Sequence, residues 1–347
     1  MGGLINFKQC LRVILPLTVA ILIPGMALPV EPPTERVRIA GAFYLGDAPT
    51  VVASERGLFA AHGIEAEVSH LASGKLSLAK LRAGEADFAL TALTPVVLDR
   101  LADADPGGWD DPVILASLAH SGDLLQIITL DRLDIRSVAD MRGKRVAIDR
   151  GTNAEFVWWL HEQYHGIERA VVELVDLSFP DIPAALVAGR IDAAVLWEPH
   201  VSILKDAQPG TRHFHLHNLY AGKWVLVTTR RTAQERRALC RQVLAAYGEA
   251  IAFMERRPDE ALALFSQRMD VATGVLAAHW NALDYGLHLD WGLIAGLQEQ
   301  LHWAQAVGYD NASEPVRVLD LIDAGPLGDL GIGAVSIPAA VPPDRVP

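Results

Sequence analysis

The sequence predicts an α/β protein of two lobes, each a mostly parallel sheet flanked by helices. Three observations predict this fold class: a strand–helix–strand order that occurs twice, 51% hydrophobic residues, and a length of 347 residues. That length is typical of two domains. A fold of about 300 residues buries about three quarters of its unfolded surface, so a sizeable core forms without disulfides.

Composition excludes several classes of protein. The chain has 30 Lys and Arg against 42 Asp and Glu, a net charge of −12, and contains no long basic run. Nucleic-acid binding depends on clustered Lys and Arg, so no nucleic-acid partner is expected. Cys10 and Cys240 are too few for a cysteine-rich metal site. No cofactor is expected.

The first 27 residues are predicted to be a signal peptide for export. Lys8 and Arg12 precede an apolar run at 13–28, and small residues favour cleavage after Ala27. The alternative is a retained membrane anchor. A membrane span needs about 20 apolar residues, and two prolines interrupt this run, which favours cleavage.

The first half of the body contains one strand–helix unit after another. Strands are expected at 36–40, which alternates and contains β-branched residues, at 65–69, and at 86–90, a short segment expected to be buried. Helices are expected at 49–62 and 76–83. Each ends at a glycine, Gly63 or Gly84, the residue that best tolerates a left-handed helix end.

The second half follows the same order. Strands are expected at 144–148, 171–175 and 192–196, and helices at 154–165 and 182–188, which end at Gly166 and Gly189. His62-Gly63-Ile64 matches His165-Gly166-Ile167 residue for residue. Units of this kind build parallel sheets with helices on both faces.

The remaining segments are assigned mainly to the first lobe. Further strands are expected at 113–117, 125–130 and 224–228, and helices at 233–254, 258–267, 275–281 and 293–307. The chain then crosses between lobes near residues 124 and 222. Residues 36–124 and 223–328 form lobe 1, residues 125–222 form lobe 2, and residues 329–347 are expected to be a loose tail rich in Pro and Ala.

Short motifs also occur in a familiar order. They are Phe43-Tyr44, Ala48-Pro49, Gly57-Leu58-Phe59, Ala83-Gly84-x-x-Asp87, Thr91-Ala-Leu-Thr94, Ser121-Gly122-Asp123, Met141-Arg-Gly-Lys-Arg-Val-Ala147, Gly151-Thr152, Ala188-Gly-x-x-Asp-Ala193 and Trp197-Glu198-Pro199. Over about residues 37–325 the chain resembles periplasmic substrate-binding proteins of ABC transporters, of the nitrate, sulfonate, taurine and pyrimidine-precursor type.

The resemblance implies a two-lobed periplasmic binding protein fold with a two-strand hinge. It implies a periplasmic monomer that binds one small molecule between its lobes and delivers it to an ABC permease in the inner membrane. No enzymatic activity is expected, because the sequence has no G-x-S-x-G motif, no P-loop and no G-x-G-x-x-G motif after a strand. A membrane-tethered ligand-sensing domain is the alternative if the N-terminal segment is retained.

The ligand site is expected where strands of both lobes end, because ligands of open α/β sheets bind outside the carboxyl ends of the strands. The candidate ligand-binding residues lie on the loops at this edge. They are Phe43, Tyr44, Asp47, Ser73, Gly74, Lys75, Thr91, Thr94, Ser121, Asp123, Gly151, Thr152, Asn153, Glu155, Trp197 and Glu198.

Two helix starts among these loops offer backbone N–H groups for an anion. They are Ser73-Gly74 and Gly151-Thr152-Asn153. Either one alone is more readily explained as an ordinary N-cap, but their matching positions in the two repeats favour a shared pocket. Four acidic residues on the loops and Lys75 as the one nearby cation favour a small polar ligand that is zwitterionic or contains nitrogen, with an amine or N–H edge. The aromatic residues on the loops could stack on a planar or cationic group or pack the lobe interface.

One motif suggests an enzyme instead. His161-Glu162-Gln163-Tyr164-His165 matches the H-E-x-x-H pattern of zinc metallohydrolases. No third ligand is apparent, and a histidine at the end of a helix has a structural explanation in the helix dipole. We therefore expect no metal at this motif, nor at His213, His215 and His217, which share one face of an extended segment.

Overall fold

The computed structural model describes residues 35–103, 107–215, 220–309, 312 and 315–337. The described residues form one compact unit. The predicted signal peptide lies outside the described residues. Within those residues, no helix is both long and apolar enough to cross a membrane.

The first sheet has seven strands, and we call the part that carries it lobe 1. Its order is β12-β11-β4-β10-β3-β1-β2. The strands are β1 (Glu35–Ala42), β2 (Ile64–Leu71), β3 (Phe88–Ala92), β4 (Pro112–Ser121), β10 (Gly222–Thr229), β11 (Asp284–Leu289) and β12 (Ala334–Val335). Strands β1, β2 and β3 are parallel, whereas β10 is antiparallel to both β3 and β4.

The second sheet has five strands, and we call the part that carries it lobe 2. Its order is β7-β6-β8-β5-β9. The strands are β5 (Leu125–Leu130), β6 (Arg145–Ile148), β7 (Glu173–Asp176), β8 (Ala193–Trp197) and β9 (Thr211–Phe214). Strands β6, β7 and β8 are parallel, whereas β5 is antiparallel to β8 and β9.

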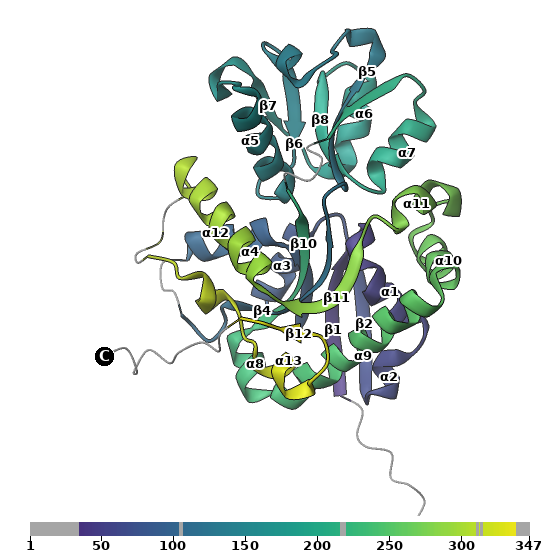
Figure 1. The fold of residues 1–347 in the computed structure, drawn as a ribbon, viewed down its shortest axis with the longest axis vertical. Coiled ribbons are helices and arrows are strands. Elements are labelled where there is room, and N and C mark those ends of the chain that lie inside the picture. The colour runs from purple at the N-terminus through teal and green to yellow at the C-terminus, as the bar shows by residue number, and fades with distance from the viewer. Residues whose placement is uncertain (1–34, 104–106, 216–219, 310–311, 313–314, 338–347) are drawn as a thin grey trace, which may run out of the picture. The chain divides into compact units, whose positions relative to one another are not determined.

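Helices flank both sheets (Figure 1). Lobe 1 carries α1 (Ala48–Glu55), α2 (Leu58–Ala61), α3 (Gly74–Arg82), α4 (Leu93–Ala102), α8 (Arg230–Glu235), α9 (Arg237–Arg256), α10 (Pro258–Met269), α11 (Thr273–Trp280), α12 (Trp291–Ala306) and α13 (Gly325–Leu330). Lobe 2 carries α5 (Asn153–His165), α6 (Ile182–Val187) and α7 (His200–Ala207). Short 3-10 helices join several of these elements.

The internal repeat is present in the strand order. The order β2-β1-β3-β10-β4 of lobe 1 corresponds to β7-β6-β8-β5-β9 of lobe 2, and the fourth strand of each is antiparallel. The four glycines predicted to end helices have φ values of 76°, 68°, 60° and 70° at positions 63, 84, 166 and 189. All four lie in the left-handed region that glycine enters without strain.

The repeated Gly-x-x-Asp motif has a structural role in both lobes. Asp87 accepts a hydrogen bond from the backbone N–H of Arg38 at 2.8 Å, and the Arg38 guanidinium donates to both Asp87 and the Gly84 carbonyl. Arg145 makes the same contacts with Asp192 and the Gly189 carbonyl. The motif therefore ties the end of a helix to strand β1 or β6.

Some predictions are corrected by the structure. Each sheet contains both parallel and antiparallel strands. The strands that cross from the other lobe, β10 in lobe 1 and β5 in lobe 2, are antiparallel to their neighbours. The helix expected at 233–254 is two helices, α8 and α9, and strands β9 and β11 were not anticipated. The tail is not loose throughout, since β12 pairs with β11 and Ile337 is buried. The proposed lobe limits at 124 and 222 stay predictions, with β4 and β10 in one sheet and β5 and β9 in the other.

The first two residues of the H-E-x-x-H segment are buried in lobe 2, whereas Gln163, Tyr164 and His165 are exposed. His161 is fully buried on α5, and neither ring nitrogen has a hydrogen-bond partner among the described residues. Glu162 is also buried and accepts a hydrogen bond from the Trp158 indole at 2.6 Å. In the part of the chain that is described, no three His, Cys, Asp or Glu side chains are grouped so as to hold a metal ion. His217 lies outside that part.

This buried histidine predicts a loss of stability in acid. Burial, together with the charges of His165 and His215, lowers the pKa of His161 to about 3, whereas an imidazole in the unfolded chain has a pKa of about 6.5. Between these two pKa values the His161 imidazole is therefore protonated in the unfolded chain but not in the folded chain. The stability is fully present above pH 6.5 and is lost progressively as the pH falls toward 3.

We expect His161→Leu to weaken this dependence of the free energy of unfolding on pH, measured by urea titration between pH 7.5 and 4. His302→Leu, at an exposed position on α12, is the control and should keep the wild-type slope. An unchanged slope in His161→Leu, or one tightly bound zinc per chain, would contradict this account.

Candidate ligand-binding site

A small cavity lies where the ends of strands from both sheets meet. Its volume is about 20 Å³, enough for about one water molecule. It is lined by Tyr44, Ser73, Gly74, Lys75, Ala92, Pro95, Thr152, Asn153, Trp197 and Trp224. Residues after β1, β2 and β3 thus meet residues after β6 and at the end of β8, and a ligand with several heavy atoms has to widen the cavity.

Seven of the residues lining the cavity were predicted from the sequence. Ala92, Pro95 and Trp224 were not. Trp224 is present because β10 is antiparallel to β3, which pairs Trp224 with Ala92 at the edge where β3 ends. Its ring also needs Gly46, because a Cβ there would lie 2.6 Å from the indole. The signal that could have identified Trp224 is an aromatic residue near the start of a strand that crosses between lobes.

Four buried polar groups around the cavity have unused hydrogen-bonding capacity. The Tyr44 hydroxyl, the Ser73 hydroxyl and the Trp197 indole N–H belong to lining residues, and none has a partner within the described residues. The same holds for the Thr91 hydroxyl, which lies beside Gly74. Such a group costs about 1–3 kcal/mol when buried unpaired. A ligand that accepts hydrogen bonds would recover this cost.

The Tyr44 hydroxyl is kept in its protonated form. Burial raises the pKa of Tyr44 well above its ordinary value, and the nearby Asp47 raises it further. The hydroxyl is therefore available as a hydrogen-bond donor.

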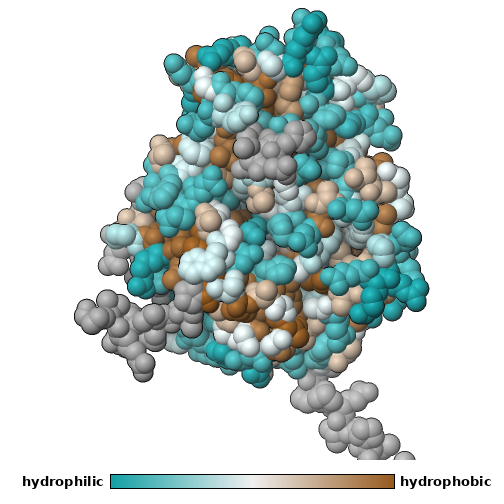
Figure 2. Space-filling model, in the orientation of Figure 1, coloured by the Kyte–Doolittle hydropathy of each residue, from teal (hydrophilic) through white to brown (hydrophobic). Residues whose placement is uncertain are grey.

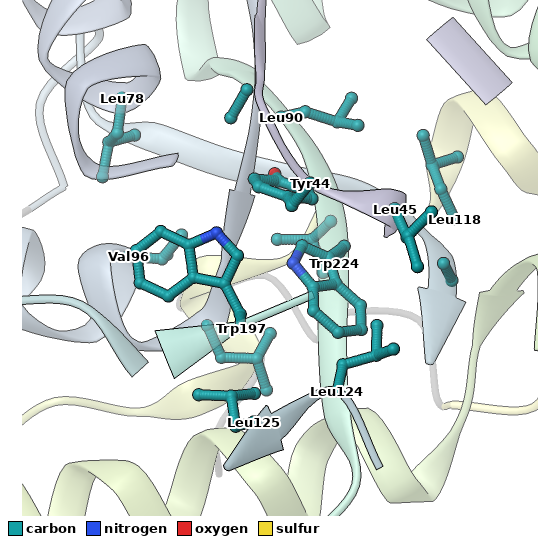
Figure 3. Close-up of a cluster of buried hydrophobic side chains, with 14 of the residues drawn as sticks. Tyr44, Leu45, Leu78, Leu90, Val96, Leu118, Leu124, Leu125, Trp197 and Trp224 are labelled. Carbon is teal, nitrogen blue, oxygen red and sulfur yellow. The ribbon is translucent and has the colours of Figure 1, made fainter. Parts of the chain in front are cut away.

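Aromatic rings form the apolar wall of the site. Figure 3 shows the rings of Tyr44, Trp197 and Trp224 grouped together among aliphatic side chains. The Tyr44 and Trp224 centroids are 5.8 Å apart. Trp197 stacks on Phe179 at 4.4 Å, and this contact fixes the indole within lobe 2.

The two helix starts differ from each other. At α5 the Thr152 hydroxyl accepts a hydrogen bond from the Ala154 N–H at 3.2 Å, so this residue is an ordinary N-cap. At α3 the Ser73 side chain makes no capping bond. Gly74 is required there by close packing, since a Cβ would lie 2.7 Å from the Thr91 Cα atom.

The acidic residues on the loops are engaged within the protein. Asp47 is fully buried below the end of β1, where it accepts from the Ala42 N–H and contacts His70, each at 2.9 Å. A Cβ at Gly41 would collide with this carboxylate. Asp47 therefore supports the loop that carries Tyr44 and does not line the cavity.

Glu155 and Glu198 bridge the lobes at opposite edges of the site. The Glu155 carboxylate accepts from the Tyr309 hydroxyl at 3.0 Å and pairs with Arg150 and Arg169. Glu198 lies 3.1 Å from His279 Nε2 on α11 and accepts from the Ser202 N–H. Figure 1 shows the helices concerned, α5 near α12 and α7 near α11.

The other candidate residues surround the cavity without lining it. The Thr94 hydroxyl donates to Gln300 at 2.6 Å. The Ser121 hydroxyl accepts from the Asp123 N–H at 3.2 Å, where β4 leads into β5. Phe43 packs its ring on His200, and its carbonyl lies 3.2 Å from His200 Nε2. Burial lowers the pKa of His200 to about 3, so this imidazole is neutral.

A larger cavity, of about 630 Å³, lies in lobe 1 between α9, β11 and residues 330–333. None of the buried unpaired polar groups in the described residues lines it. Ile332 and Val335 are exposed nearby, and apolar residues gather over α13 and β12 (Figure 2). The small cavity is the candidate site because the unused donors surround it.

Two proteins with sequences similar to this chain are named as binding proteins. A putative binding protein of Brucella abortus is 26% identical over 193 residues, which are 54% of this chain and 55% of that protein. The chain thus spans about half the length of this relative. A putative aliphatic sulfonates-binding protein of Escherichia coli is 24% identical over 266 residues, which are 73% of this chain and 77% of that protein.

Solved structures share the fold. The alkanesulfonate-binding protein SsuA from Xanthomonas axonopodis pv. citri, bound to MOPS, aligns with a TM-score of 0.70 at 19% identity and covers 80% of this chain and 95% of its own. The desulfurization enzyme DSZB aligns with a TM-score of 0.65 at 18% identity, and the alignment covers 85% of this chain and 98% of the DSZB chain. The predicted periplasmic binding protein fold is confirmed.

Sequence similarity identifies the family as well as the fold. The family model described as NMT1/THI5 like matches residues 46–261, which include most of the loops around the cavity and both crossings between the sheets. The chain belongs to the NMT1/THI5-like family.

Proposed function

We propose that this protein is the solute-binding component of an ABC importer and that it captures a small organic oxoanion of the sulfonate class. The observation that carries the proposal is the group of unpaired buried donors on Tyr44, Ser73, Thr91 and Trp197 around one cavity. A sulfonate offers three acceptor oxygens to such donors, and its organic part can lie against Trp197 and Trp224. The names of the E. coli and Xanthomonas relatives agree with this ligand class.

This ligand differs from the mixed-charge ligand that the sequence favours. The carboxylates of Asp47, Glu155 and Glu198 already have hydrogen-bond or ionic partners inside the protein. The unused groups at the cavity can all donate: three are hydroxyls, which can also accept, and the Trp197 indole N–H only donates. An anion with an apolar tail matches these groups better than an amine does.

The proposed role includes export and a membrane partner. The sequence of residues 1–27 favours export to the periplasm, where a solute-binding protein meets its ligand. The ligand is then delivered to a permease in the inner membrane, and the protein acts as a monomer without a cofactor. The contacts of Glu155 and Glu198 across the lobes support a ligand held between two lobes that close on it.

Catalysis is the rival function because an enzyme shares the fold. Within the described residues the one cysteine is Cys240 on α9, which is buried. Burial raises the pKa of its thiol to about 12, and its sulfur contacts the Thr232 carbonyl at 3.7 Å. A thiol with so high a pKa is a poor nucleophile, which supports binding without turnover.

The first test of the site uses ethanesulfonate and calorimetric titration. Ser73→Ala and Tyr44→Phe should each weaken binding about 10- to 100-fold, because each removes a hydrogen bond to a charged group worth about 1.5–3 kcal/mol. Ser266→Ala on α10 and Tyr164→Phe at an exposed position are the matched controls and should bind as wild type does. Equal affinity in all four variants would place the ligand elsewhere.

The second test concerns turnover. After long incubation of the protein with an alkanesulfonate or an arylsulfinate, we expect the compound to be recovered unchanged and no sulfite to be released. The measurement is sulfite determination together with chromatography of the recovered ligand. Sulfite in excess of one equivalent per chain would show that the protein is an enzyme.

A further inference from the structure

Lys75 occupies an unusual position for a cation. It follows the N-cap Ser73 and Gly74 in the first turn of α3, where the helix dipole disfavours positive charge. It is also the one charged residue among those that line the cavity. Its placement therefore calls for a compensating interaction.

Lobe 2 supplies that interaction. The Lys75 ammonium donates to Asp149 Oδ1 at 2.5 Å and to the Arg150 carbonyl at 2.7 Å. The aliphatic stem passes Gly151, where a Cβ would lie 3.3 Å from Lys75 Cδ. The Asp149 side chain is only 6% exposed, against 39% for Lys75. The ammonium is thus fixed beside a buried carboxylate at the end of β6.

The ion pair between Lys75 and Asp149 determines the net charge around a bound ligand. The ion pair contributes no net charge to the cavity, and the other polar groups are neutral donors. A helix N-terminus adds about half a positive charge, which suits a ligand with one negative charge. A second negative charge would be desolvated without a countercharge, and burial of an uncompensated charge is costly.

We propose that Asp149 determines the charge selectivity of the cavity: by holding the Lys75 ammonium it directs binding to singly charged oxoanions and disfavours dianions. This inference rests on the proposed function. It assigns to Asp149 a role in specificity although the residue does not line the cavity.

The test compares two sulfonates of similar size, ethanesulfonate with one negative charge and sulfoacetate with two, by calorimetric titration at pH 7.5. The quantity of interest is the ratio of the two dissociation constants. Loss of a contact between the lobes affects both ligands alike and cancels in this ratio. Wild type should prefer ethanesulfonate.

Asp149→Asn frees the Lys75 charge and should shift the ratio toward sulfoacetate by about tenfold or more. Lys75→Met leaves Asp149 uncompensated and should shift the ratio the other way, which keeps the proposal testable if Asp149→Asn does not fold. The double variant should return close to the wild-type ratio.

A ratio within twofold of wild type in both single variants would overturn the proposal, and so would a double variant that keeps the shift of Asp149→Asn. If wild type binds neither sulfonate, the proposed function itself fails. If wild type binds ethanesulfonate and the ratio does not respond, only the role of Asp149 fails.

Discussion

Burying a hydroxyl or an indole N–H without a hydrogen-bond partner costs a folded protein about 1–3 kcal/mol. In this structure several such groups surround one cavity, on Tyr44, Ser73, Thr91 and Trp197. The total free energy of unfolding of a folded protein is only about 5–15 kcal/mol, so these unpaired donors reduce it substantially. Their concentration at the ends of the strands is explained if an oxoanion completes their hydrogen bonds. The aromatic wall and the Lys75–Asp149 pair then have consistent roles.

The repeat explains how one fold brings these groups together. In each lobe three parallel strands end at the same edge, and an antiparallel strand that has crossed from the other lobe begins there. The crossing strand places Trp224 beside the end of β3 in lobe 1 and Leu125 beside Trp197 in lobe 2. The Gly-x-x-Asp motifs act at the opposite ends of these strands, where Arg38 and Arg145 join helix to strand. The contacts that stabilise each lobe and the residues that line the cavity therefore lie at opposite ends of the strands.

Local patterns in the sequence predicted the parts that local chemistry determines. Glycines at 63, 84, 166 and 189 marked the ends of helices, and hydroxyl residues marked the loops at the strand ends. The pairing of β11 with β12 could not be predicted in this way, because it joins segments distant in the chain through backbone groups. The partners of the acidic residues on the loops could not be predicted from the sequence either. Glu155 depends on Tyr309, 154 positions away, and Glu198 on His279, and no local pattern identifies such partners.

The central claim is that neutral donors at the strand ends bind the anion while Lys75 remains paired with Asp149. A crystal structure of the protein grown with ethanesulfonate tests it most directly. We expect sulfonate oxygens within hydrogen-bond distance of the Tyr44 hydroxyl, the Ser73 hydroxyl and the Trp197 indole, with the Lys75 ammonium still on Asp149. A sulfonate bound to the Lys75 ammonium, with those donors still unpaired, would contradict it.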